Sequence, residues 1–141
     1  MKALLKMSVL ALAMVVMAGC ASNGGGSGAS DKDLVDAIIA DQIAALNEQD
    51  IDKLVAHYSE DFESDQGGDL AGTKEFINAA IEGGLLDGLE IDLSSMETTF
   101  PESGKASVGP VDLEASFGTM TLEFDLEKRD GTWLIVYMAQ Y

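Results

Sequence analysis

The stretch that decides the fold is residues 43–62, Ile-Ala-Ala-Leu-Asn-Glu-Gln-Asp-Ile-Asp-Lys-Leu-Val-Ala-His-Tyr-Ser-Glu-Asp-Phe. Its first four residues close an apolar pattern of helical spacing that begins at Leu34, and residues 47–49 interrupt that pattern. Asp50 can cap a second helix, because its carboxylate can accept hydrogen bonds from backbone N–H groups of the first turn. We expect this second helix to bury Ile51, Leu54, Val55, Tyr58 and Phe62. The stretch therefore predicts two consecutive helices joined by a short break.

The residues on either side extend this helical half of the chain. Ser30 and Asp33 form an approximate capping box ahead of the first helix. Residues 65–68, Asp-Gln-Gly-Gly, predict a turn, after which Thr73 is expected to cap a third helix that ends at residues 83–84, Gly-Gly. The residues of this helix expected to face inward are Phe76, Ile77, Ala80 and Ile81. Three helices are therefore predicted before residue 85.

Beyond residue 88 the apolar residues change from helical spacing to strict alternation, which is typical of strands. The alternating segments are residues 89–94, 111–117 and 120–127. Asp130-Gly131 indicates a hairpin that leads into a last strand, residues 133–141, whose two apolar faces predict a central position. Pro110 predicts an edge or a bulge in the second segment. Helices first and antiparallel strands afterwards predict an α+β fold with helices on one face of a curved sheet.

With its elements in this order, the chain from residue 33 to 141 resembles the nuclear-transport-factor-2-like superfamily, including its SnoaL-like and ketosteroid-isomerase-like branches. The resemblance rests on residues 43–62, on residues 72–76, Gly-Thr-Lys-Glu-Phe, and on residues 130–135, Asp-Gly-Thr-Trp-Leu-Ile. It implies a cone, in which a curved antiparallel sheet wraps around three N-terminal helices and leaves a pocket at the open end. Many members dimerise through the sheet. The superfamily holds isomerases, dehydratases, polyketide cyclases and non-catalytic binding domains, so the fold alone leaves the function open.

Ketosteroid-isomerase-like members use a carboxylate base after the second helix and a tyrosine hydroxyl from the first helix. When the chain is aligned on Asp50 and Tyr58, those two positions hold Gln66 and Gln42. Glutamine is no base near neutral pH, and Asp65 lies one residue from the base position. This departure from the family pattern argues against steroid-isomerase chemistry.

Other polar side chains are candidates for catalysis of a different kind. His57 is the only histidine, the residue type that titrates near neutral pH. On a continuous helix Asp61 lies one turn later, and a His57–Asp61 pair would suit a general base. The alternative is a helix-surface pair with Lys53 one turn earlier on the same face. An enzyme of the cyclase, dehydratase or isomerase type would use His57 with Asp61 or Asp65.

Aromatic side chains either line a pocket of the family type or fill the core. The candidates are Tyr58, Phe62, Phe76, Phe117, Phe124, Trp133 and Tyr137. The acidic residues between Glu60 and Asp69 do not form a calcium loop, because Gln66 and Gly72 stand where that loop needs glycine and glutamate. We therefore expect neither a metal site nor a bound cofactor.

The first twenty residues predict a lipid anchor. Lys2 and Lys6 precede an apolar run, residues 7–17, which is long enough for a signal peptide and too short to span a bilayer comfortably. Ala18 and Gly19 then precede Cys20, the only cysteine of the chain. This arrangement resembles the lipobox of bacterial lipoproteins, which implies that the Cys20 thiol is acylated and becomes the new N-terminus. A plain secretory signal with an incidental cysteine is the alternative.

This interpretation divides the chain into three parts. Residues 1–19 are the lipoprotein signal peptide, residues 20–30 are the lipidated cysteine and a flexible Gly/Ser tether, and residues 31–141 are the domain. By resemblance to Gram-negative lipoproteins, Ala21 after the cysteine implies anchoring in the outer membrane rather than the inner one. The domain would then face the periplasm.

The charge of the chain limits its partners. The formal charge is −17, and removal of residues 1–19 takes away Lys2 and Lys6 but no acid, which lowers it by two to −19. Such a surface repels nucleic acid and anionic lipids. The acidic row Glu123, Asp125 and Glu127 opposes the homodimer that the family makes possible.

Together these observations predict a lipid-anchored, non-catalytic domain that binds a small apolar ligand or an envelope protein. The alternatives are the enzyme described above and an envelope interaction protein that uses the outer face of its sheet.

Overall fold

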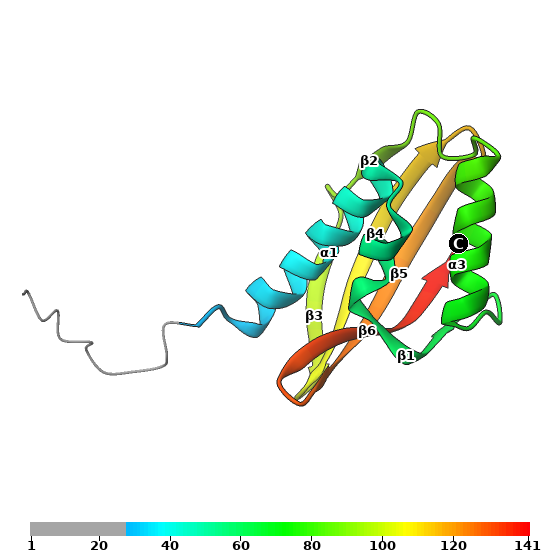
Figure 1. Cartoon of the computed structure of the whole chain (residues 1–141). Helices are drawn as coiled ribbons and strands as arrows, with labels where there is room; N and C mark the ends of the chain where they lie inside the picture. Colours follow the sequence, from blue (N-terminus) through cyan, green and yellow to red (C-terminus); the bar gives the residue numbers. More distant parts are fainter. Residues whose placement is uncertain (1–27) are drawn as a thin grey trace, which may run out of the picture.

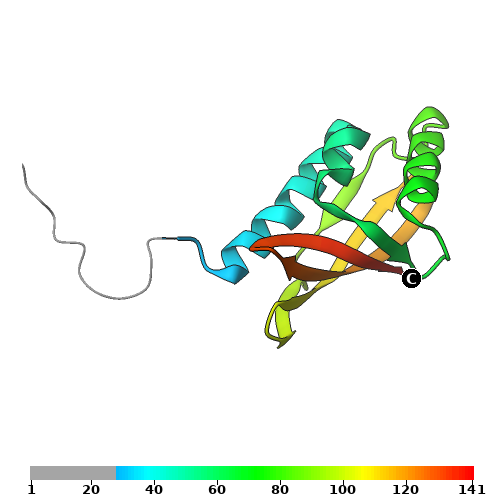
Figure 2. The ribbon, with the colours of Figure 1, turned by 60° about the horizontal axis from the view of Figure 1, so that its bottom comes forward.

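The computed structural model describes residues 28–141, so the predictions on residues 1–27, Cys20 among them, lie outside the described residues. The helices are α1 (Asp31–Glu48), α2 (Ile51–Leu54) and α3 (Leu70–Glu82), with a 3-10 turn, η1 (Val55–His57), directly after α2. The strands are β1 (Tyr58–Ser64), β2 (Glu90–Asp92), β3 (Glu97–Glu102), β4 (Lys105–Ala115), β5 (Gly118–Arg129) and β6 (Thr132–Gln140). The predicted α+β class is confirmed, and α1 and α3 stand on the same concave side of the sheet (Figures 1 and 2).

The sheet runs in the order β1-β6-β5-β4-β2, and β3 pairs with β4 on the same side as β2. The last strand, β6, lies between β1 and β5, as its two apolar faces predicted. Every pairing is antiparallel except that of β1 with β6, which is parallel. The sheet is therefore mixed, and the prediction of a purely antiparallel sheet is wrong for this one strand.

The predicted start of α1 and the predicted last hairpin are both confirmed in atomic detail. Ser30 Oγ accepts a hydrogen bond from the Asp33 backbone N–H over 3.2 Å, and Asp33 Oδ2 accepts one from the Ser30 N–H over 3.0 Å. Asp130 and Gly131 have φ angles of 51° and 82°, the left-handed pair that a two-residue hairpin of type I′ requires. Both features depend on neighbouring residues alone, which is why the sequence predicts them well.

The second helix is much shorter than predicted. It ends at Leu54, and after η1 the chain becomes extended at Tyr58 and runs beside β6 as an edge strand. Phe62, 1% exposed, remains buried as predicted, and its ring lies 4.6 Å from that of Tyr58. A spacing of four residues keeps two side chains on one face of either a helix or a strand, so this pattern did not distinguish the two.

The strand β3 and the first half of β4 were not predicted, because proline and glycine interrupt the alternation there. Pro101 lies in β3, and Gly109-Pro110 lies in β4, where the pairing with β5 shifts register, so the bulge predicted from Pro110 is confirmed. A Cβ atom on Gly109 would lie 2.7 Å from Cγ of Glu123 on β5. Only glycine allows the two strands to approach this closely at the bulge.

Helix α3 differs from the prediction at its start and on its buried face. Its cap is Asp69, whose Oδ1 accepts a hydrogen bond from the Gly72 N–H over 2.8 Å, while Thr73, the predicted cap, is 7% exposed inside the helix. Phe76 was predicted to face inward but is 60% exposed. The predicted end at Gly83-Gly84 is confirmed, since Gly84 adopts a left-handed φ of 68°.

The core lies between α1 and the concave face of the sheet. It is made by one cluster of buried residues, Val35, Ile38, Ile39, Tyr58, Phe62, Ala106, Val108, Val111, Leu113, Leu122, Phe124, Leu126, Trp133 and Ile135. Helix α3 is less completely covered, because only Thr73 and Ala80 of its 13 residues are buried. Ile77 and Ile81, on the side of α3 that faces α1 and α2, are therefore only half-buried.

Candidate functional site

Aromatic residues fill the interior of the cone. Tyr58, Phe62, Phe124 and Trp133 are all 8% exposed or less and belong to the core cluster. Phe117 packs against that cluster from its border, Tyr137 is half-buried, and Phe76 lies on the outer surface of α3. Burial also raises the pKa of the Tyr58 hydroxyl, so this group stays protonated. Four of the seven predicted pocket residues therefore belong to the core, two are partly buried, and Phe76 is exposed.

Among residues 28–141, Gln42 is the one side-chain amide that is buried, at 1% exposure. Its Nε2 donates to the Leu54 carbonyl over 2.7 Å, which holds α2 against α1. Its Oε1 has no hydrogen-bond partner among the described residues. An unpaired buried acceptor costs about 1–3 kcal/mol. Gln42 was noted from the sequence only as a replacement for the family tyrosine, and its structural role could not be read from sequence spacing.

His57 pairs with a residue of α1 rather than with Asp61. Its Nε2 lies 3.0 Å from Oδ2 of Asp41, and the two side chains are 31% and 65% exposed. This pair joins α1 to η1 at the surface. The helix ends at η1 and the chain then becomes a strand, so Asp61 does not lie one helical turn after His57 as predicted. The structure therefore does not bring His57 and Asp61 together.

Asp61 on β1 is held by an arginine at the end of β5, two strands away in the sheet. Arg129 Nη1 donates to Asp61 Oδ1 over 2.6 Å, and Arg129 Nη2 donates to Glu127 Oε2 over 2.9 Å. Asp65 lies elsewhere, where its Oδ2 accepts a hydrogen bond from the Gln140 N–H over 3.0 Å. The predicted candidates thus have three different partners, and His57, Asp61 and Asp65 line neither of the two hollows described below.

The ion pair of Asp61 predicts a defined pH dependence. The Arg129 guanidinium lowers the pKa of Asp61 to about 2, from about 3.9 in an unfolded chain. A lowered pKa adds stability above the unfolded value and loses it as the pH falls through the folded value. The stability advantage of the wild type over Asp61→Asn is therefore expected to be constant above pH 5 and to disappear between about pH 4 and pH 2. Urea unfolding of both proteins across this range tests it, and an advantage unchanged at pH 2 would contradict it.

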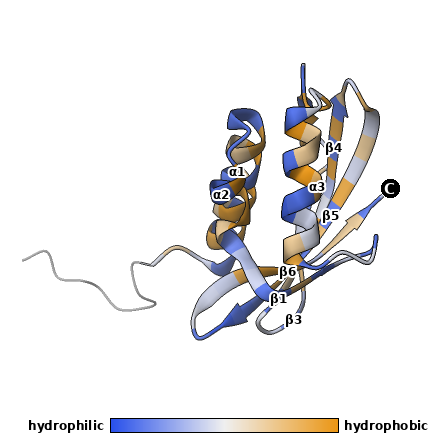
Figure 3. Ribbon diagram, turned by 45° about the vertical axis from the view of Figure 1, so that its right-hand side comes forward, coloured by the Kyte–Doolittle hydropathy of each residue, from blue (hydrophilic) through white to orange (hydrophobic). Residues whose placement is uncertain are grey.

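A narrow apolar crevice lies between α1–α2 and α3. It measures about 150 Å³ and has no room for a water molecule in this structure. One wall comes from Ala45, Leu46, Gln49, Asp50, Ile51 and Leu54, and the other from Ile77, Ile81 and Leu86. Figure 3 shows the two helical walls side by side, with hydrophobic residues on each. Of these residues, the sequence assigned Ile51 and Leu54 to the buried face of the second helix and Ile77 and Ile81 to that of the third. The incomplete cover over α3 could not be predicted from their spacing.

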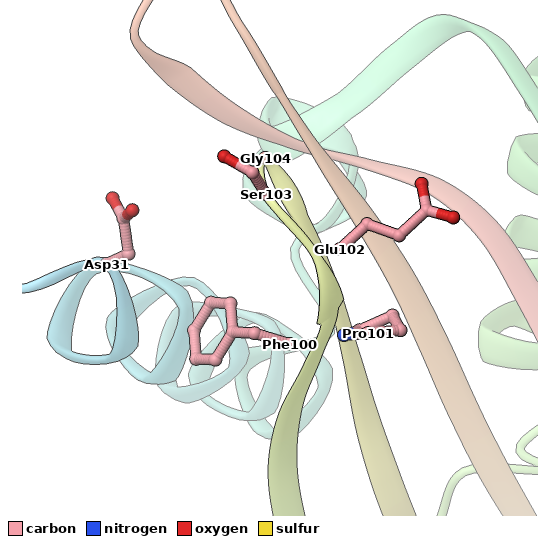
Figure 4. A pocket seen from close by; sticks show the side chains of 6 residues that line it. All are labelled: Asp31, Phe100, Pro101, Glu102, Ser103 and Gly104. Carbon is pink, nitrogen blue, oxygen red and sulfur yellow. The ribbon is translucent and has the colours of Figure 1, made fainter.

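A second, open hollow of about 420 Å³ lies at the opposite end of α1, beside the β3–β4 hairpin. Figure 4 shows Phe100 reaching from β3 toward the first turn of α1, with Asp31 beyond it. Asp31 Oδ1 accepts hydrogen bonds from Lys128 Nζ over 2.6 Å and from Trp133 Nε1 over 3.1 Å. These bonds keep the pKa of Asp31 below its usual range and fasten the start of α1 to the sheet. Asp31, which lines this hollow, therefore has a structural role, because it holds the first turn of α1 against the sheet.

Within residues 28–141 no cluster of three or more histidine, cysteine or acidic side chains has the geometry of a metal site. The same residues include no helix that is long and apolar enough to cross a bilayer.

No protein-family model and no curated protein matches the chain by sequence. Its structure is similar to that of a nuclear-transport-factor-2-like protein of unknown function from Pseudomonas putida, with a TM-score of 0.64 and 13% identity over 80% of this chain and 88% of that one. An uncharacterised protein with a cystatin-like fold from Caulobacter vibrioides gives a TM-score of 0.65 and 14% identity over 77% and 87%. A hexachlorocyclohexane dehydrochlorinase from Novosphingobium barchaimii gives 0.64 and 14% over 78% and 84%.

The chain therefore has the nuclear-transport-factor-2-like fold that its sequence predicted. Identities this low establish the fold alone, and the neighbours with this fold include an enzyme as well as proteins of unknown function. The function has to be argued from the site.

Proposed function

We propose that this protein is a lipid-anchored binding protein of the bacterial envelope, whose cone domain holds an apolar ligand or segment without catalysing a reaction. The observation that carries the proposal is the apolar crevice between α1–α2 and α3. Aliphatic side chains line both of its walls, and those of Ile51, Ile77 and Ile81 are only half-buried. An apolar ligand would enter here by parting the two helical walls, because the crevice has no room for a water molecule in this structure.

The arrangement of polar groups supports binding rather than catalysis. A general base must lie within hydrogen-bond reach of the proton that it removes, next to space for a substrate. His57 and Asp61 are instead engaged by Asp41 and Arg129 at the surface. The enzyme alternative would require both residues to leave these partners.

The anchor is the second part of the proposal. It rests on the resemblance of residues 1–20 to a lipoprotein signal and on the Gly/Ser tether that follows. Residues 28–30 lead directly into α1, and the crevice residues Ala45 and Leu46 lie at the other end of that helix. The 18 residues of α1 span about 27 Å, so the proposed crevice would open away from the membrane.

A photoactivatable aliphatic amino acid at position 81 of the full-length chain tests the binding site in cells. On illumination we expect adducts of discrete mass, because Ile81 lines the crevice. Leu93 is the matched control, being an aliphatic residue of 37% exposure outside the crevice. Labelling from position 81 that does not exceed labelling from position 93 would overturn the proposed site.

A further inference from the structure

The outer face of the sheet lies opposite α1 and α3, which both stand on the concave side (Figure 2). Glu123, Asp125 and Glu127 alternate along β5 with three buried core residues, so their side chains point outward. On the neighbouring strand β6, Tyr137 pairs with Asp125 and Leu134 pairs with Glu127, and both side chains are half-buried. Because residues that pair across two strands share one side of the sheet, this face combines carboxylates with apolar and aromatic groups.

Several carboxylates of the outer face have no cationic partner. Within residues 28–141, neither Glu123 nor Asp125 takes part in an ion pair, and the same holds for Glu63 of β1, which lies opposite Tyr137. The basic residues of the sheet belong to β4 and β5, and each of them is already engaged by an acidic side chain. The face therefore carries negative charge that the described part of the chain does not neutralise.

The ring of Tyr141, at 73% exposure, lies beside these carboxylates. Its backbone N–H donates to the Thr121 carbonyl over 3.0 Å, and its carbonyl accepts from the Thr121 N–H over 3.1 Å, which fixes it next to β5. The negative charge of Glu123 is the largest cause of a raised pKa of the Tyr141 hydroxyl, and Asp65 and Asp125 add to it. The ring and the carboxylates are therefore parts of one surface.

An arginine side chain matches both components of this surface. Its guanidinium donates paired hydrogen bonds to a carboxylate, and it also stacks on the face of an aromatic ring. Outward residues of one strand, such as Glu123 and Asp125, recur about every 7 Å. Arginines at every second position of an extended segment recur at the same distance. The surface is therefore complementary to an extended segment that carries several arginines.

Two other occupants fit these observations less well. A second copy of the chain would press Glu123 and Asp125 against the same residues of its partner, and the chain carries a formal charge of −17. An anionic lipid surface would be repelled in the same way. Charge therefore favours a cationic protein segment.

We propose that the outer face of β5 and β6 binds an arginine-rich protein segment, with guanidinium groups on Glu123 and Asp125 and against the ring of Tyr141. This face lies on the opposite side of the sheet from the helices that form the crevice, so the inference does not rest on the proposed ligand site.

The test uses the full-length protein purified in a mild neutral detergent, with the detergent alone as the blank. The probe is a fluorescent peptide of about ten residues in which Arg alternates with Ser, and its binding is followed by anisotropy. A second peptide has citrulline, a neutral side chain of the same shape, in place of each Arg. We expect the Arg peptide to bind at least about tenfold more tightly in 0.1 M salt. In 1 M salt, where the Debye length falls from about 10 Å to about 3 Å, this preference should be largely lost.

Three variants locate the attraction. Glu123→Gln with Asp125→Asn removes two charges from the outer face and keeps the shape of both side chains, and it is expected to weaken the Arg peptide at least about fivefold. Glu75→Gln with Glu82→Gln removes two charges from exposed residues of α3, on the other side of the sheet, and should weaken it less than about twofold. Tyr141→Ala removes the exposed ring without changing the charge and should weaken it about threefold.

The opposite results would overturn the inference. Equal binding of the Arg and citrulline peptides would show that the face has no preference for cations, and equal weakening by the two charge variants would assign the attraction to the whole acidic surface. Unchanged binding by Tyr141→Ala would place the peptide elsewhere. A wild-type dimer that becomes tighter in Glu123→Gln with Asp125→Asn would identify the face as an interface between copies. None of these results alters the photolabelling expected from Ile81, so the proposed function is tested separately.

Discussion

Replacing Cys20 with serine is expected to abolish lipid modification and to leave the signal peptide attached. The thiol of Cys20 is the only sulfhydryl of the chain, and the resemblance to a lipobox makes it both the acylation site and the new N-terminus. Serine has no thiol to form the thioether. The wild type should therefore begin at Cys20 and carry acyl mass, whereas Cys20→Ser should retain residues 1–19 without it. Intact-mass measurement of both proteins from the membrane fraction provides the comparison.

A conservative change beside the cysteine serves as the control. Ala21→Ser keeps the thiol and should leave the acyl mass in place. A wild-type protein that lacks acyl mass, or that starts at a residue other than Cys20, would refute the anchor. Several acyl chains are needed for firm membrane attachment, because each buried CH₂ contributes only about 0.8 kcal/mol and a single myristoyl chain is released readily.

The proposed anchor and the fold together would set the geometry of the proposed binding. Asp31 at the start of α1 accepts hydrogen bonds from Lys128 and Trp133, so the proposed tether would join the domain at a point held against the sheet. The crevice would then lie farther from the bilayer than the tether joint, where soluble envelope proteins can approach it.

The parts of the fold that the sequence predicted are those decided by neighbouring residues. The Ser30–Asp33 capping box and the Asp130-Gly131 hairpin each depend on residues no more than three positions apart. The central position of β6 followed from apolar residues on both of its faces. Strand β1 was missed because its pairing with β6 joins segments that lie far apart in the chain. Such pairing overrides local preference and leaves no local signal.

The candidate site was less predictable for the same reason. On a helix, His57 and Asp61 would have been neighbours, but the chain becomes extended between them at Tyr58. Each then finds a partner from a distant segment, Asp41 in one case and Arg129 in the other. The crevice depends on how completely α3 is covered, and this cannot be read from the spacing of its aliphatic residues.

Phe62→Ala is expected to cause a large loss of stability. The Phe62 side chain is 1% exposed and packs 4.6 Å from the ring of Tyr58, in the core beneath β1. Removing a buried phenylalanine costs about 3–5 kcal/mol in lost transfer free energy and cavity formation. A domain of this size has a free energy of unfolding of about 5–15 kcal/mol, so the change removes a large share of it. Urea unfolding followed through Trp133, the only tryptophan, measures the loss.

Phe76→Ala is the matched control, because the same atoms are removed from a side chain that is 60% exposed. We expect its free energy of unfolding to stay within about 0.5 kcal/mol of the wild type. Both phenylalanines sit at inward positions of the helices that the sequence predicted, and only one of them is buried in the structure. Losses of similar size in the two variants would contradict this prediction. They would mean that Phe76 is packed against the domain more closely than its 60% exposure indicates, and that α3 is as fully covered as the rest of the core.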